Sequence, residues 1–475
     1  MIRAGLIVAL ALAGACGPKK PAEVPPDPVV VSDPEIVQLH GALAQRYVAA
    51  AQDGEVIARL RIDTRPFAQG TRPPLNLALA IDTSGSMEGE PIDHARDAAL
   101  SMVDKLRDGD RLAVVVFHSH TELLVESTVV DAETRPIIKA RIETMKAAGT
   151  TDLAGGLQQA LQQTYNHAIA DGVNRVVLLS DGVPNDESQI LSLADQSRGY
   201  NVSVTALGLG LDYNETLLGA IAQRSGGSFH FIESANVVAN VFDQEVLRLQ
   251  RVVARQLLVT LTPGPGVTIN NAIGYPTSVS GRNVYVQLGD LSEGEERDIY
   301  VRLGVRGHRG GATVELVDAA LSFQDAAVGA GALSRTLFLS VRSTDEEAKL
   351  LEGRDEQLEK DALRAELAAV VVQAIATARS GQLPQAQAIL SDAVPRARAA
   401  AARYDDPSFG AQADEMIKVN RDLPAVVPAP PPVQPGMPQP SADAPSVAPS
   451  PKAAGNVRRA HSTAVETFQN RPSSR

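Results

Sequence analysis

The side chains of this sequence that are best suited to binding a ligand carry oxygen atoms. They follow each of two apolar runs or lie between the two runs. The runs occupy residues 75–81 and 175–180. Hydroxyl and carboxylate oxygens suit a hard divalent cation, above all Mg²⁺, with Mn²⁺ or Ca²⁺ as alternatives. The set combines three hydroxyl groups with only two carboxylates, and its members are Asp82, Ser84, Ser86, Thr151 and Asp181.

The charge of this set says what else the site would need. Two carboxylates are few for a closed cation cage built from protein ligands alone. Mg²⁺ keeps waters and tolerates few protein carboxylates, so coordination positions would stay open. We therefore expect an acidic side chain of a protein partner to complete the site.

The elements that must position these residues follow an α/β pattern. Apolar runs alternate with amphipathic helical spacing, which predicts a mostly parallel sheet covered on both faces. In the doubly wound order 3-2-1-4-5-6 the first and fourth strands are neighbours, and ligands bind beyond their carboxyl ends. Asp82 and Asp181 would then lie side by side. Strands are expected at 75–81, 111–117, 122–127, 175–180, 202–207 and 228–232.

Three short segments resemble the loops of a known family. They read Asp-Thr-Ser-Gly-Ser at 82–86, Thr-Asp-Leu-Ala-Gly-Gly-Leu at 151–157 and Leu-Ser-Asp-Gly at 179–182. They are similar to the loops of von Willebrand factor type A domains that carry a metal-ion-dependent adhesion site. Residues 209–215 (LGLDYNE) look like the bacterial secreted branch of that family, here with a lipoprotein N-terminus.

The resemblance implies a six-stranded Rossmann-like sheet and a role for each site residue. Ser84 and Ser86 would bind the metal directly, and Thr151 would be a ligand that comes and goes. Asp82 and Asp181 would bind directly or through water. Thr151 is assigned rather than its neighbour because it precedes Gly156 by five residues, as the loop threonine of the family does.

Catalytic interpretations fit the same residues less well. An aspartic protease needs two Asp-Thr-Gly or Asp-Ser-Gly loops, but Ser84 stands where the glycine belongs. An aspartyl-phosphate phosphatase needs a carboxylate at that same position. His118 and His120 offer two imidazoles, but a pair alone makes a poor metal site. We therefore expect a binding protein and not an enzyme.

The N-terminus predicts a lipid anchor. A short basic start and a ten-residue apolar run precede Cys16, the single cysteine of the chain. This resembles a bacterial lipoprotein signal, in which Cys16 would become the lipidated first residue, although Ala13 stands where a larger aliphatic residue is usual. Gly17 is not the aspartate that retains lipoproteins in the inner membrane, which favours the outer membrane of a bacterial cell envelope.

The composition limits the partners. The net charge of −12 and the absence of a basic patch argue against nucleic acid. Contact with a membrane is expected through the N-terminal lipid only. The favoured function is an envelope adhesion or scaffold module, and the alternative is an accessory subunit that recruits a client to an envelope enzyme, ATPase or secretion assembly.

Composition shifts divide the 475 residues into segments. After residue 252 strands occur without helices, which predicts a β-sandwich that an earlier strand may complete. The expected basic tail could contact anionic lipid or the acidic domain, but a solvated end is favoured. The segments are a signal peptide (1–15), a Pro-rich tether with a weak helix (16–50), a strand of the sandwich (51–74), the type A domain (75–251), the sandwich (252–344), a helical hairpin (345–423), a disordered Pro-rich linker (424–455) and the tail (456–475).

Overall fold

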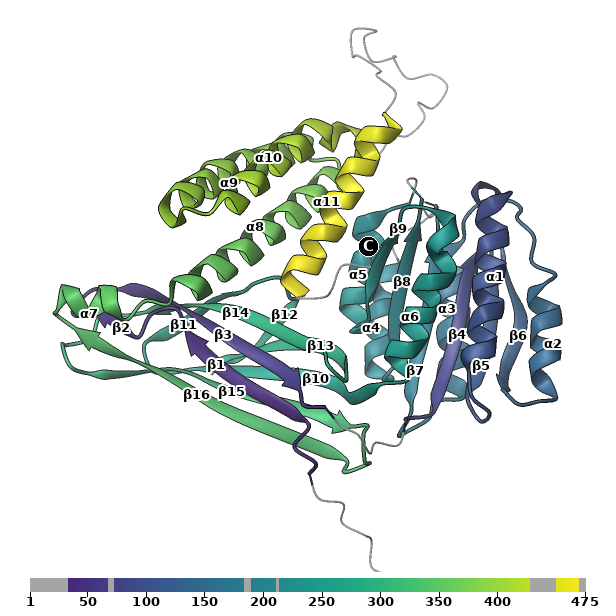
Figure 1. Ribbon diagram of the computed structural model, residues 1–475, viewed down its shortest axis with the longest axis horizontal. Helices are drawn as coiled ribbons and strands as arrows, with labels where there is room; N and C mark the ends of the chain where they lie inside the picture. Colours follow the sequence, from purple (N-terminus) through teal and green to yellow (C-terminus); the bar gives the residue numbers. More distant parts are fainter. Residues whose placement is uncertain (1–32, 67–71, 183–188, 211–212, 428–449, 470–475) are drawn as a thin grey trace, which may run out of the picture.

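The computed structural model describes residues 33–66, 72–182, 189–210, 213–427 and 450–469. They form an α/β domain, a β-sandwich and a group of C-terminal helices (Figure 1). The predicted fold class is thereby confirmed. The predicted signal segment and Cys16 lie outside the described residues, as do residues 428–449 of the predicted linker. None of the helices in the described ranges is both long and apolar enough to span a bilayer.

The α/β domain is built on a six-stranded sheet. Its strands are β4 (Leu75–Asp82), β5 (Arg111–Phe117), β6 (Thr121–Val129), β7 (Val173–Ser180), β8 (Ser203–Leu209) and β9 (Phe229–Ile232). Their order is β6-β5-β4-β7-β8-β9, with β6 antiparallel and the other pairings parallel. This is the doubly wound order predicted from the sequence, so β4 and β7 are neighbours. Every residue of both strands is buried, as expected for strands covered by helices on two faces.

Six α-helices and two 3₁₀ turns surround this sheet. They are η1 (Gly85–Met87), α1 (Glu90–Lys105), α2 (Thr134–Ile142), α3 (Leu153–Asn166), α4 (Ile190–Gly199), α5 (Glu215–Ser225), η2 (Ala235–Val237) and α6 (Val238–Leu249). Alternate residues of β4 point into two apolar cores, one on each face of the sheet. Leu77 and Leu79 share a core with α1, α2 and α6, whereas Ala78 and Ala80 share a core with α3, α4 and α5. The small alanines allow α3 to approach closely. A Cβ atom on Gly156 would lie 2.3 Å from the Phe117 ring.

The sandwich consists of two antiparallel sheets that share one core. Its strands are β1 (Val37–Leu43), β2 (Tyr47–Ala49), β3 (Gly54–Thr64), β10 (Val252–Pro263), β11 (Val267–Ala272), β12 (Thr277–Ser280), β13 (Asn283–Ser292), β14 (Glu296–Val305), β15 (Thr313–Asp325) and β16 (Ala332–Thr344). One sheet has the order β1-β3-β14-β11 and the other β12-β13-β10-β15-β16-β2, where only β2 pairs in parallel. Because β3 precedes the α/β domain and pairs with β14 after it, the α/β domain is inserted into the sandwich.

The helix predicted within residues 16–50 is wrong. Residues 37–43 form β1, which pairs with β3 along its full length, and residues 47–49 form β2. The local helical spacing was weak, and pairing with distant strands overrides it. Gly41 fits beneath β16, because a Cβ atom there would lie 2.4 Å from Leu337.

The C-terminal region contains more helix than the predicted hairpin. Its helices are α7 (Glu347–Glu352), α8 (Glu356–Arg379), α9 (Leu383–Tyr404), α10 (Pro407–Asp422), η3 (Leu423–Val426) and α11 (Pro451–Gln469). α8 ends at the predicted Ser380-Gly381 break, where Gly381 adopts a φ of 83° that favours glycine. α8, α9, α10 and α11 share one apolar core.

The prediction of a solvated basic tail is wrong for its described part. Residues 456–469 belong to α11, which lies between α8 and the α/β domain (Figure 1). Its buried face includes Val457, Ala460 and Ala464. Arg458 is only 4% exposed, whereas Arg459 forms an ion pair with Glu233 of the α/β domain. Residues 451–455, which were predicted to end the disordered linker, form the first turn of α11.

His461 makes the docking of α11 sensitive to acid. Burial lowers its pKa to about 4, while Glu215 raises it and Arg379 lowers it by smaller amounts. The pKa of an unfolded histidine is about 6.5. Between these pH values His461 is mostly neutral when α11 is docked and mostly protonated when it is undocked. The free energy that favours docking therefore decreases as the pH falls from about 6.5 through about 4.

Hydrogen exchange of α11 measures this effect. We expect faster exchange at about pH 5 than at about pH 7.5, after correction for the intrinsic rate, and a smaller difference in His461→Leu. A difference of the same size in both proteins would contradict the assignment to His461.

Candidate metal centre

The two carboxylates lie at the carboxyl edge of the central strands. Asp82 ends β4, and Asp181 directly follows β7. The strands pair in parallel, with Ile81 opposite Leu179, so their ends emerge together. Asp82 is fully buried, and Asp181 is 8% exposed. The strand order therefore brings the two carboxylates to one place, as predicted from the sequence.

The first loop brings Ser84 and Ser86 to the same place. Ser84 caps the 3₁₀ turn η1, and its backbone N–H donates to Asp82 Oδ1 at 2.9 Å. The hydroxyl groups of Ser84 and Ser86 lie 3.0 Å apart. Ser86 also donates to Asp181 Oδ1 at 2.8 Å, which links this loop to the loop after β7. Ser84 is buried, and Ser86 is exposed.

The loop that carries Thr151 is held against the first loop by the backbone. Gly85 N–H donates to Gly149 O at 3.0 Å, and Ala148 N–H donates to Thr83 O at 2.7 Å. A Cβ atom on Gly182 would lie 3.0 Å from Thr151 Oγ1 and 3.8 Å from Asp82 Oδ2. Thr151 therefore faces the same region as the carboxylates, and Gly182 leaves room for it.

The electrostatics of the site centre on Asp82. Burial raises the pKa of its carboxyl group, and hydrogen bonds from Ser84 and Ser180 oppose that rise. Ser180 donates its hydroxyl proton to Asp82 Oδ2 at 2.7 Å. A divalent cation would favour the ionised carboxylate strongly. The donor set fits such a cation, because it consists of oxygen atoms from three loops that meet at one point.

Sequence reasoning missed the role of Ser180 and of Ser119. Ser180 stands next to Asp181 in the third loop segment, so its position was a usable signal. The Ser119 hydroxyl accepts from Thr150 N–H at 3.0 Å, which supports the Thr151 loop. His118 and His120 lie beside that loop with ring centroids 4.2 Å apart. Within the described residues, no cluster of three or more His, Cys, Asp or Glu side chains is arranged to hold a metal.

Comparisons with known proteins agree with this fold. A family model of the von Willebrand factor type A domain matches residues 76–244. The uncharacterized protein sll0103 of Synechocystis sp. is 30% identical over 271 residues, covering 54% of this chain and 64% of that protein. The uncharacterized protein YfbK of Escherichia coli is 27% identical over 248 residues, covering 50% of this chain and 43% of that protein. The matches thus span less than two thirds of either relative.

A solved structure shares the architecture beyond the α/β domain. The von Willebrand factor type A protein from Catenulispora acidiphila is 18% identical and superposes with a TM-score of 0.66. The superposition covers 91% of this chain and 97% of that one, which shows a common fold. With the matched family model and the strand order described above, we conclude that this chain contains a von Willebrand factor type A domain, a module that usually serves protein–protein interaction or adhesion.

Proposed function

We propose that this protein binds a protein partner through a Mg²⁺ ion, which is held by the five site residues and completed by a glutamate or aspartate of the partner. The protein would act as an adhesion or scaffold module of the bacterial cell envelope. Its role is binding and not catalysis.

One observation carries the proposal. Oxygen atoms from three loops converge at the carboxyl edge of β4 and β7, and hydrogen bonds of 2.8–3.0 Å connect Ser84, Ser86 and Asp181. These groups match the preference of Mg²⁺ for oxygen ligands in a loosely filled shell.

The charge of the set explains why a partner carboxylate would be favoured. Two carboxylates only balance the charge of a divalent cation, and neutral hydroxyl groups fill further positions. The site then carries no net negative charge, so a third carboxylate can replace water on the ion without net repulsion. Because the ion and that carboxylate would be largely desolvated, losing one ligand should abolish the contact.

Calorimetric titration of residues 17–475 with Mg²⁺ tests the proposal. We expect one saturable site in the wild-type protein and none in Asp181→Ala. Adding acetate should tighten Mg²⁺ binding, because acetate imitates the side chain of the partner. Absence of saturable binding with and without acetate would refute the metal bridge.

We further propose that Cys16 carries the lipid that anchors the protein, with the outer membrane favoured. The proposal rests on the N-terminal sequence, which lies outside the described residues. Cys16→Ser should move the protein from the membrane fraction to the soluble fraction. A protein that stays in the membrane fraction after this substitution would refute lipid anchoring.

A further inference from the structure

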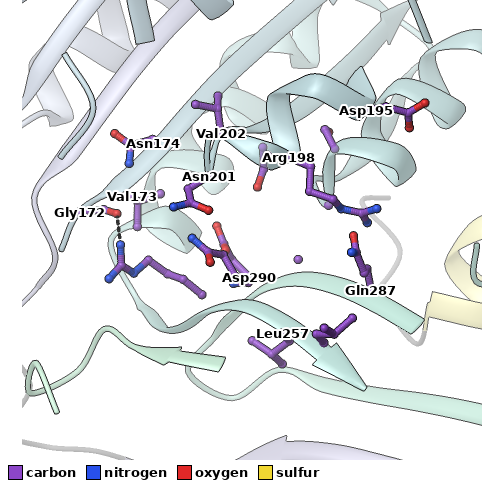
Figure 2. A pocket seen from close by; sticks show the side chains of 18 residues that line it. Gly172, Val173, Asn174, Asp195, Arg198, Asn201, Val202, Leu257, Gln287 and Asp290 are labelled. Atoms are coloured by element: carbon purple, nitrogen blue, oxygen red, sulfur yellow. Dashed lines mark hydrogen bonds between the residues drawn. The ribbon is translucent and has the colours of Figure 1, made fainter. Parts of the chain in front are cut away.

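A cavity of about 460 Å³ lies between the α/β domain and the β-sandwich (Figure 2). Val173 and Asn174, the first residues of β7, line it, whereas Asp181 follows the other end of that strand. Eight residues at about 3.3 Å each separate the two places by roughly 25 Å. The cavity is therefore distinct from the candidate metal centre.

The backbone around the cavity is irregular. The pairing of β10 with β13 shifts register three times between Val252 and Leu258. Gln256 in this stretch adopts a φ of 58°, which costs energy for a residue other than glycine. On one side the two domains touch, because a Cβ atom on Gly289 would lie 1.8 Å from Gly226 O. Bulges of this kind redirect side chains and are common beside functional sites.

Polar atoms in the lining lack partners. Arg198 Nη2, Gln287 Oε1 and Arg255 Nε are buried and make no hydrogen bond with any residue that the structure describes. Buried polar groups in proteins nearly always have a partner. In Figure 2 the Arg198 guanidinium group and the Gln287 amide point toward one another from the two domains. A donor and an acceptor are thus available at one end of the cavity.

The acidic side chains of the lining already have partners. Asp290 accepts from Arg175 at 2.7 Å and from Gln256 N–H at 3.2 Å. Asp195 accepts from Arg224 at 2.8 Å. Burial lowers the pKa of Arg198, while Asp195 acts in the opposite direction. An added negative charge would therefore compensate the half-buried Arg198 cation.

We propose that this cavity binds a small aliphatic 2-hydroxy or 2-amino acid, whose carboxylate accepts from Arg198 and whose hydroxyl or ammonium group donates to Gln287 Oε1. The neighbouring donor and acceptor on the ligand match the neighbouring acceptor and donor of the cavity. Leu258, an apolar residue of the lining that is only half-buried, offers apolar surface for an aliphatic chain. The volume lies in the range of small-molecule sites, about 300–1,000 Å³.

Ligand-observed NMR on the whole protein, with four matched probes, tests the proposal. L-Leucine and 2-hydroxy-4-methylpentanoate carry both groups, 4-methylpentanoate lacks the donor, and 2-hydroxy-4-methylpentanamide lacks the carboxylate. We expect at least one of the first two probes to bind, and both truncated probes to bind at least about 10-fold more weakly. Equal binding of all four probes, or binding of none at millimolar concentration, would overturn the proposal.

Protein variants locate the site independently. Arg198→Met and Gln287→Leu should each weaken binding of the responsive probe by at least about 10-fold. The matched control is Arg251→Met, because this exposed arginine pairs with Glu293 and neither residue lines the cavity, so the variant should keep the wild-type affinity. Asp181→Ala should also keep it, which separates this proposal from the metal bridge. Unchanged affinity in both Arg198→Met and Gln287→Leu would refute the assignment even if one variant folds poorly.

Discussion

Replacing Ser86 by alanine is expected to abolish saturable Mg²⁺ binding and to leave the fold intact. Ser86 is exposed, and its substitution removes the part-buried hydrogen bond to Asp181, so the free energy of unfolding should fall by about 1 kcal/mol. Its hydroxyl group contacts Ser84 and donates to Asp181, which joins the two loops of the site. Loss of a direct ligand should weaken Mg²⁺ binding by at least about 100-fold.

Calorimetry and thermal unfolding measure the two effects separately. Ser192→Ala is the matched control, because Ser192 is another exposed serine of the same domain. Its hydroxyl group accepts a hydrogen bond from Gln196, which does not belong to the candidate site. It should retain wild-type Mg²⁺ affinity. Undiminished affinity in Ser86→Ala would contradict the assignment of Ser86 as a ligand.

Asp82 is a less suitable residue for this experiment. Its carboxylate is fully buried and accepts hydrogen bonds from the Ser84 N–H and the Ser180 hydroxyl group. Asp82→Ala would leave both buried donors without an acceptor, at a cost of about 1–3 kcal/mol each. Lost Mg²⁺ binding in that variant could follow from a collapsed loop. The exposure of Ser86, which only the structure reveals, makes it the cleaner test.

The α/β domain could be predicted from the sequence because its signals are local. Each buried strand is a continuous apolar run, and counting these runs was sufficient to place Asp82 beside Asp181. The same reasoning placed Ser180 at the end of a strand and predicted no contact for its side chain. Its hydrogen bond to Asp82 depends on which side of β7 it faces, and the run of buried residues carries no alternation that indicates the side.

The misassigned segments depend on partners far away in the sequence. The residues of β1 favour neither a helix nor a strand clearly. They form a strand because they pair with β3 and lie beneath β16. The apolar residues of α11 do recur with helical spacing, which was an available signal. The burial of Arg458 was not predictable, since its counter-charge is Glu215 in the α/β domain.

That buried charge leads to the second large expected effect. Glu215 is fully buried at the start of α5 and faces two arginines, Arg379 of α8 and Arg458 of α11. Arg379 Nε lies 3.2 Å from Glu215 Oε1, and Arg458 Nε lies 3.5 Å from Glu215 Oε2. Glu215→Gln keeps the shape of the side chain and removes its charge. We expect the docking of α8 and α11 on the α/β domain to lose about 3–5 kcal/mol, because the buried Arg458 and the partly buried Arg379 lose their counter-charge.

Glu233, which directly follows β9 and faces the same helix α11, supplies the matched control. It pairs with Arg459, the residue next to Arg458, but its side chain is 59% exposed and that of Arg459 is 43% exposed. Exposed ion pairs contribute about 0–1 kcal/mol, so Glu233→Gln should leave docking almost unchanged. The two variants make the same chemical change at the same interface and differ in burial.

Hydrogen exchange of α11 and chemical denaturation distinguish the outcomes. Glu215→Gln should accelerate exchange in α11 strongly, whereas β4 and β7 should stay protected because the ion pairs of Glu215 join α5 to α8 and α11 and involve neither strand. The hydrogen bonds that join Asp82, Ser84, Ser86 and Asp181 do not involve Glu215, so Mg²⁺ binding should survive. Similar exchange in the Glu215 and Glu233 variants would show that apolar packing alone holds α11. Loss of Mg²⁺ binding together with docking would instead mean that the C-terminal helices stabilise the edge of the sheet where the metal centre lies.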